Sequence, residues 1–170
     1  MLKVFDRYED MDFRQLMDVY VQWNCDYGKN QYSRHSENLQ MLYAEQDFYD
    51  FLISFFLNEN ARYFVWAPQK RYTAALRVQP YMDGLLLEAL ETAPDDRRKG
   101  YATDLVKATI SYYSIQKPWT IYSHIRKSNK ESLSVHYKCG FSVISNDAVF
   151  LDGTYHKDAY TLVYKYNPAD

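Results

Sequence analysis

The sequence predicts a single mixed α/β domain over residues 1–170, built around a mostly antiparallel sheet. A length of 170 residues suits one domain with a hydrophobic core of its own. A content of 47% hydrophobic and 25% charged residues is typical of a globular protein. Segments with strand and helix periodicity follow the order β-α-α-β-β-β-α-β-α-β-β, without a repeat, a low-complexity tract or a linker.

The N-terminal third predicts one strand and two helices. Alternating apolar and polar residues at the N-terminus are typical of an edge strand. Acidic residues and a serine stand ahead of apolar side chains with helical spacing, as helix N-caps do. The predicted segments are a strand at 1–5, a helix from Asp10 or Asp12 to just before Gly28, a loop at 27–34, and a helix from Ser36 to about Asn58.

The middle of the chain predicts three strands and a helix. Residues 68–70 and 82–84 are short turns, and such short connections favour antiparallel neighbours. The predicted segments are strands at 61–67, 71–79 and 85–92, followed by an amphipathic helix at 100–116.

The C-terminal third predicts a strand, a helix and a final antiparallel pair of strands. Gly140 stands where a C-cap glycine ends a helix, and Asp152-Gly153 is a hairpin turn. The predicted segments are a strand at 119–125, a helix at 128–139, and strands at 141–149 and 155–164.

Charge and composition exclude several classes of protein. The net charge of −2 gives no overall basic field to attract nucleic acid or an anionic membrane. No apolar run approaches the ~20 residues of a membrane span, and the N-terminus lacks the apolar stretch of a secretory signal. Cys25 and Cys139 alone do not make a disulfide framework, which favours a reducing cytoplasm. The cysteines and histidines show no zinc spacing, so we expect no metal.

Eighteen tyrosines are an unusual number for this length. Tyrosine combines an apolar ring with a polar hydroxyl, so these side chains suit the wall of a pocket or an interface. A bias toward tyrosine in strands explains the same count, and the sequence leaves both interpretations open.

A basic turn between a strand and a helix is the first motif that carries chemistry. Residues 97–102 read R-R-K-G-Y-A and fit R-x-x-G-x-A after Pro94. Gly100 lets a ligand approach the backbone, and the N–H groups of residues 98–102 lack helix partners. Such a turn suits a phosphate or pyrophosphate. It is neither a P-loop nor a dinucleotide fingerprint, because both need more glycines.

A second motif follows the next predicted strand. Asn129 and Ser132 open a helix that ends in Gly140-Phe141. With both motifs in order, the chain resembles the GNAT superfamily of N-acetyltransferases. The family has a strand, a Pro and R-x-x-G-x-G/A, and later N-x-x-A/S before a helix and G-F. The resemblance covers nearly the whole chain in element order and residues 85–141 at motif level.

The resemblance implies that acetyl-CoA lies between strands 85–92 and 119–125, as neighbouring parallel strands that splay apart. The turn would bind the pyrophosphate, and the pantetheine would pair with the first strand like an added strand. The residues implied are Arg97, Arg98, Lys99, Gly100, Tyr101 and Ala102 for the pyrophosphate, Leu90, Glu91 and Thr92 for the pantetheine, and Asn129 and Ser132 for its arm.

The resemblance also implies the reaction, a direct attack of a neutral primary amine on the thioester. That reaction needs a base, a donor to the oxyanion and an acid for the thiolate. The acceptor would be a small-molecule or peptide amine, and a homodimer is compatible with the family. The acceptor site would be built from the two N-terminal helices, residues 27–34 and the hairpin 147–156, with Tyr32 and Tyr155 as contacts. Aromatic walls would suit an aromatic, apolar-tailed or cationic amine.

The acid is expected at His136 or Tyr137. The family usually places Tyr four residues before the Gly of Gly-Phe, and that position is His136 here. Tyr137 points about 100° away around the helix, so only one of them can face the sulfur, and we rank His136 first. Alternatively, His136 only packs and the thiolate leaves unaided.

The base is expected at Glu88. Glu88 and Glu91 stand in an otherwise apolar strand, on opposite faces by their odd spacing. Apolar neighbours raise a carboxylate pKa toward neutrality. Alternatives are Glu91, a water chain, or a structural role in which Glu88 pairs with Arg77. A β-bulge, which is common at this position in the family, would interrupt the alternation of side chains, so that the odd spacing would no longer place Glu88 and Glu91 on opposite faces.

Two other functions remain open from the sequence. One is an acyl-CoA-binding sensor or module with little transferase activity, and the other is a structural or dimerisation domain without CoA. Cys139 precedes Gly140 in an apolar position, so we expect it to be buried rather than nucleophilic.

Overall fold

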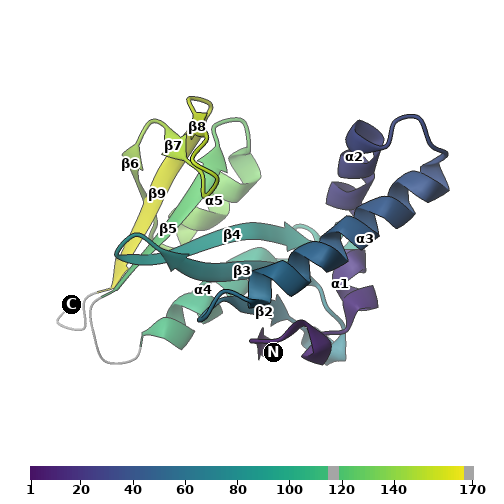
Figure 1. The fold of residues 1–170 in the computed structure, drawn as a ribbon. Coiled ribbons are helices and arrows are strands. Elements are labelled where there is room, and N and C mark those ends of the chain that lie inside the picture. Colours follow the sequence, from purple (N-terminus) through teal and green to yellow (C-terminus); the bar gives the residue numbers. More distant parts are fainter. Residues whose placement is uncertain (115–118, 167–170) are drawn as a thin grey trace.

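The structure is a computed structural model, and it describes residues 1–114 and 119–166. It confirms a mixed α/β fold with one seven-stranded sheet in the order β1-β2-β3-β4-β5-β9-β6, and it adds a two-stranded ladder of β7 and β8 (Figure 1). The strands are β1 Leu2–Phe5, β2 Arg62–Trp66, β3 Ala74–Tyr81, β4 Gly84–Thr92, β5 Trp119–Arg126, β6 Ser142–Ser145, β7 Ala148–Val149, β8 Tyr155–His156 and β9 Ala159–Tyr166. The helices are α1 Phe13–Val19, α2 Val21–Gln31, α3 Glu37–Phe56, α4 Tyr101–Tyr113 and α5 Lys130–Lys138, with 3-10 turns at Tyr8–Asp10, Pro68–Lys70 and Pro94–Asp96.

The sheet is antiparallel except between β4 and β5. These two strands pair in parallel at Leu85 with Ile121 and at Leu86 with Tyr122. Beyond Leu86 the described ladder between them ends, while both strands continue. The predicted splayed parallel pair is therefore confirmed, and it leaves one backbone edge of β4 unpaired.

A bulge interrupts β4 in its second half. The register between β3 and β4 shifts between Ala75 and Arg77. On β4, Ala89 has a φ of 53°, which is rare for a residue with a side chain. The hydroxyl of Tyr20 donates a hydrogen bond to the Ala89 carbonyl at 2.6 Å. A side chain from the first helical region therefore stabilises the bulge.

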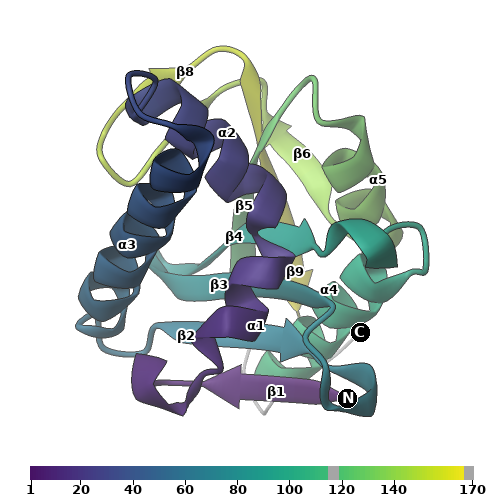
Figure 2. The ribbon, with the colours of Figure 1, turned by 90° about the vertical axis from the view of Figure 1, so that its right-hand side faces the viewer.

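Two hydrophobic clusters lie on opposite faces of the sheet. On β2, Tyr63 and Val65 join α1 and α3 in one cluster, whereas Phe64 joins α4 and α5 in the other. Figures 1 and 2 show α1–α3 on one side of strands β2–β4 and α4 on the other. The period-two alternation of a strand thus separates the two sides of the molecule.

The first predicted helix is wrong in its extent. It divides at Tyr20 into α1 and α2, and α2 continues through Gly28 to Gln31, where a loop was predicted. Gly28 is buried against α3, and a Cβ at this position would lie 2.6 Å from the Gln40 carbonyl oxygen. The glycine therefore serves the close approach of two helices and does not end one.

The predicted strand 141–149 is two strands. Ser142–Ser145 pairs with β9, with a register shift between Val143 and Ser145, and Ala148–Val149 pairs with β8. The hairpin turn at Asp152-Gly153 is confirmed between β7 and β8. The helix predicted at 100–116 ends at Tyr113, and residue 116 lies outside the described residues.

Candidate functional site

A cavity of about 850 Å³ lies beside the second half of β4 and the first turns of α4 and α5, and we call it the cofactor cavity. Every residue predicted to contact acetyl-CoA lines it, except Lys99. These residues are Leu90, Glu91, Thr92, Arg97, Arg98, Gly100, Tyr101, Ala102, Asn129 and Ser132. The lining residues that sequence reasoning missed are Asp96, Thr103, Lys130, Glu131, Ser134, Val135 and Lys138.

The turn before α4 presents backbone N–H groups to this cavity. Gly100 is the N-cap of α4 with a φ of 88°, and no side chain of the described residues caps the helix. A Cβ at Gly100 would meet nothing within 4 Å, so the approach to the helix N-terminus is open. Free N–H groups and the positive end of the helix dipole favour an anion here.

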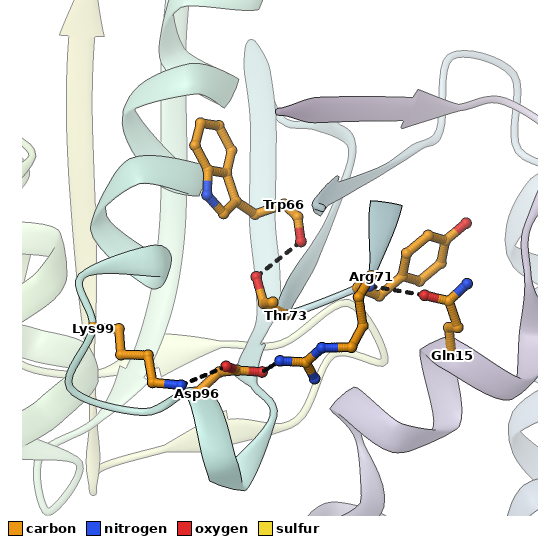
Figure 3. Close-up of polar contacts among 7 residues, drawn as sticks. Gln15, Trp66, Arg71, Thr73, Asp96 and Lys99 are labelled. Carbon is orange, nitrogen blue, oxygen red and sulfur yellow. Dashed lines mark hydrogen bonds and ion pairs between the residues drawn. The ribbon is translucent and has the colours of Figure 1, made fainter. Parts of the chain in front are cut away.

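A buried carboxylate anchors this turn, as Figure 3 shows. Asp96 is 2% exposed and accepts Arg71 Nη2 at 2.5 Å and Lys99 Nζ at 2.9 Å. Burial acts to raise the pKa of Asp96, but the hydrogen bonds from Lys99 and Arg71 and their charges outweigh it and lower that pKa. Lys99 is therefore tied to Asp96, which explains why it does not line the cavity.

The loop that carries Arg71 is itself fixed on both sides (Figure 3). Thr73 Oγ1 donates to the Trp66 carbonyl at 3.0 Å. Gln15 Oε1, on α1, accepts the backbone N–H of Tyr72 at 2.9 Å. The basic turn, the β2–β3 loop and α1 thus form one connected polar network.

A second cavity, of about 290 Å³, lies between α2, α3 and the sheet, and we call it the aromatic cavity. Its lining residues are Tyr20, Trp23, Tyr27, Asp47, Phe48, Phe51, Arg77, Ala89 and Glu91. It lies where the acceptor site was predicted from the N-terminal helices, and Tyr27 belongs to it. Tyr32 and Tyr155 do not line it.

Glu91 lines both cavities. Its carboxylate is half-buried, and burial raises the pKa of Glu91, with the charge of Arg97 acting in the opposite direction. A carboxylate with a raised pKa between two cavities is suited to take a proton from a group bound in one of them.

Comparisons with known proteins show which folds the chain is similar to. The family of FR47-like proteins matches residues 68–150. The ribosomal-protein-S18-alanine N-acetyltransferase of Escherichia coli has a TM-score of 0.63 at 17% identity, over 100% of this chain and 97% of that one. The chain has the fold of the GNAT acetyltransferases. The resemblance seen in the sequence is thereby confirmed at the level of the fold.

Two further GNAT structures contain CoA. The PaiA N-acetyltransferase of Thermoplasma acidophilum, in complex with coenzyme A, has a TM-score of 0.62 at 14% identity, over 98% of this chain and 99% of that one. The spermidine N-acetyltransferase of Vibrio cholerae, in complex with CoA and spermine, has a TM-score of 0.60 at 20% identity, over 96% and 95%. No curated protein matches the chain in sequence.

Within this GNAT fold, Glu88 does not occupy the place expected of the base. It lies opposite Arg77 in the β3–β4 ladder and lines neither cavity. Its Oε1 accepts Arg77 Nε at 2.8 Å and Gln79 Nε2 at 2.6 Å. Glu88, expected as the base, is therefore the carboxylate paired in the sheet, and Glu91, its alternative, is the carboxylate at both cavities.

Neither His136 nor Tyr137 lines the cofactor cavity or the aromatic cavity. His136 is 1% exposed, and its Nδ1 lies 2.8 Å from the Ser132 carbonyl oxygen, one helical turn earlier. Burial lowers the pKa of His136 to about 4, so the ring is neutral near pH 7. Tyr137 is 48% exposed on the outer side of α5. His136, ranked first as the acid, is therefore a packed and neutral ring, as in the alternative in which the thiolate leaves unaided.

Among residues 1–114 and 119–166, no group of three or more His, Cys, Asp or Glu side chains is arranged to hold a metal ion. In the same part of the chain, no helix combines the length and the apolar character that crossing a bilayer requires. Cys139 is 7% exposed, as expected for a packed thiol.

Proposed function

We propose that this protein is an acetyl-CoA-dependent N-acetyltransferase that moves the acetyl group to a primary amine by direct attack in a ternary complex. The observation that carries the proposal is Glu91, which lines both the cofactor cavity and the aromatic cavity. An amine in the aromatic cavity and a thioester in the cofactor cavity would meet at this carboxylate. The GNAT fold supports acetyl transfer as the class of reaction.

The residues of the cofactor cavity fit CoA in chemical terms. Backbone N–H groups of residues 98–102, with the cations Arg97 and Arg98, suit the pyrophosphate. The edge of β4 beyond Leu86 is unpaired on the side of β5, as an added strand requires. Asn129 Oδ1 accepts the Ser132 N–H at 3.0 Å, which leaves the Asn129 amide NH₂ group to donate to the pantetheine arm.

Glu91 is the base in this proposal. The amine must lose its proton before it attacks, and a half-buried carboxylate with a raised pKa accepts that proton more readily than an exposed one. Acetyl-CoA supplies the activated carbonyl and a thiolate leaving group. In this proposal the thiolate leaves unaided and takes its proton from water.

The first test is isothermal titration of acetyl-CoA into wild-type protein, Gly100→Glu and Gly153→Glu. Gly153 is the matched control, since it has a φ of 80° and open space around a Cβ, as Gly100 has, but lies in the β7–β8 hairpin. A glutamate carboxylate about 4 Å from a charged phosphate oxygen of the ligand would repel it by on the order of 4 kcal/mol at an effective dielectric constant of 20. We expect Gly100→Glu to weaken binding about a hundredfold or more and Gly153→Glu to preserve it.

A second candidate is an acyl-CoA-binding module with little turnover, and the burial of His136 favours it, because the family position of the acid holds a neutral, enclosed ring. Assay of a broad panel of primary amines separates the two functions. Amine-dependent release of CoA supports the transferase. Tight binding of acetyl-CoA without transfer to any amine supports the module, and no binding at all removes both.

A further inference from the structure

We infer that the aromatic cavity selects acceptors that carry a second cationic group, which Asp47 binds while the reacting amine lies at Glu91. The inference rests on the proposed function and names the class of its acceptor. Asp47 comes from α3 and Glu91 from β4, so the two carboxylates belong to the helical wall and the sheet wall of one cavity. A short diamine is the simplest molecule that places one amine at each of these two carboxylates.

Asp47 is oriented by two tyrosines but carries no compensating charge. The hydroxyls of Tyr27 and Tyr32 both donate to its Oδ2, at 3.0 and 2.5 Å. The hydrogen bond to Asp47 is the main cause that raises the pKa of Tyr32 to about 12. In the described part of the chain, no Lys, Arg or His forms an ion pair with Asp47. Two neutral donors fix one oxygen and leave the negative charge for a ligand.

The walls around Asp47 also favour a cation. Trp23 and Tyr27 stack with ring centroids 5.0 Å apart and an interplanar angle of 13°, and both line the cavity. Electron-rich ring faces attract ammonium groups within about 6 Å. Trp23 is 45% exposed, so this wall is reachable from solvent.

The cationic side chain in the cavity, Arg77, does not change this balance. Its Nε pairs with Glu88 at 2.8 Å, and its guanidinium lies 4.3 Å from the centre of the Phe51 ring. The charge of Arg77 is therefore compensated on the sheet side, while Asp47 and Glu91 remain. An acceptor that bears a carboxylate would meet the negative charge of Asp47, which forms no ion pair within the described residues.

The size of the cavity favours a small acceptor over a peptide. Its volume of about 290 Å³ is at the low end of small-molecule sites. The site therefore suits a short chain with an amine at one end and a cation at the other. A monoamine of the same length would leave Asp47 unpaired in a half-buried site, and that loss of a charged contact lowers affinity.

The test compares three acceptors of equal chain length, namely 1,4-diaminobutane, n-butylamine and 4-aminobutanoate, with acetyl-CoA. We expect kcat/KM to fall in that order, with at least a roughly tenfold preference for the diamine over the monoamine. Asp47→Asn should raise the KM for the diamine roughly tenfold or more, with a much smaller effect on kcat and on either constant for n-butylamine. The selectivity between the two amines should then disappear.

Asp50→Asn is the matched control, because Asp50 is an exposed residue of the same helix that accepts a hydrogen bond from Gln46. This substitution removes the same charge and should leave kcat and KM unchanged for both the diamine and n-butylamine. Equal losses for the diamine and n-butylamine in Asp47→Asn would overturn the inference. A preference of the wild type for n-butylamine would overturn it too, with the transferase function intact.

If acetyl-CoA binds but no amine is acetylated, the proposed function fails. The binding of a second cationic group by Asp47 is then tested by the affinity of the amines alone. Isothermal titration of 1,4-diaminobutane and of n-butylamine into the CoA complex measures it. Tighter binding of the diamine that is lost in Asp47→Asn supports a dication site. Equal affinities for the two probes contradict it.

Discussion

Glu91 and Glu88 have different environments although they are close in sequence. Glu91 lines both cavities, whereas Glu88 accepts hydrogen bonds from Arg77 and Gln79. We predict that Glu91→Gln lowers kcat about a hundredfold or more, because the amide cannot accept the proton of the amine. Steady-state kinetics with any acceptor found in the panel measures this.

The pH dependence of the rate checks the same assignment. Only ionised Glu91 is a base, and burial raises its pKa above the ordinary value of 4.5. The acidic limb of kcat/KM should therefore fall off at a higher pH than an exposed glutamate would give. In Glu91→Gln this limb should be absent, and its persistence would point to another base.

Glu88→Gln is predicted to affect stability more than catalysis. Arg77 and Glu88 are 20% and 23% exposed, and the substitution leaves the guanidinium without its charged partner. The loss of a charge-assisted hydrogen bond costs about 2 kcal/mol of unfolding free energy, which urea denaturation measures. A large fall in kcat in this variant, with Glu91→Gln active, would reverse the roles of the two carboxylates.

Asp96 provides a prediction about acid stability. Its pKa is lowered in the folded protein, so its contribution is present above the unfolded-state pKa of about 3.9 and is lost as the pH falls through the folded value. Asp96→Asn should be less stable than the wild type at pH 7, by about 2 kcal/mol. The two stabilities should converge at low pH, and parallel curves down to pH 2 would contradict the role of the ionised carboxylate.

At the scale of secondary structure, Gly28 gives a prediction with a defined sign. Alanine normally stabilises a helix by about 1 kcal/mol relative to glycine. In α2, however, a Cβ at Gly28 would lie 2.6 Å from the Gln40 carbonyl oxygen. Gly28→Ala should therefore destabilise the protein, by about 1–3 kcal/mol in urea denaturation.

The control is Asn30→Ala, at an exposed position of the same helix. It gains helix propensity without a clash, so we expect a neutral or slightly stabilising effect. If Gly28→Ala is as stable as Asn30→Ala, the close packing of α2 on α3 is not what retains the glycine.

Elements with strong local signals could be predicted from the sequence. The basic turn at 97–102 and the start of α5 follow from a proline, a glycine and an asparagine cap, and nearly all residues predicted there line one cavity. Distant contacts determine the rest. The bulge that changes the place of Glu91 depends on a hydroxyl from Tyr20, 69 positions away. The register of β6 likewise depends on β9.

Side-chain partners across the fold explain the misses at the site. The sequence shows Lys99 as one more cation of the turn, but Asp96 and the distant Arg71 share its neighbourhood. Asp47 has no local mark that distinguishes it from other acidic residues of a long helix. The signal is its pairing with Tyr27 and Tyr32, which exists only once α2 and α3 are packed together.

At the scale of the whole molecule, acetyl-CoA should stabilise the folded state. Ligand at a hundred times its Kd adds about 2.7 kcal/mol, which corresponds to a rise in Tm of roughly 5–10 °C for a chain of this size. Gly100→Glu should show no such rise, whereas Gly153→Glu should match the wild type. A thermal shift that is equal in both variants would show that acetyl-CoA stabilises the protein from another site.

Apart from Glu91, which lines both cavities, the sheet separates the groups that we propose for the acetyl donor from those that we propose for the acceptor. The cofactor cavity borders α4 and α5, while the aromatic cavity borders α2 and α3 on the opposite face. Mutations in Trp23, Tyr27 or Asp47 can therefore accumulate without disturbing the basic turn or its anchor Asp96. A lineage with this architecture can exchange its acceptors while it keeps its donor, and a library confined to these positions would follow the same route in the laboratory.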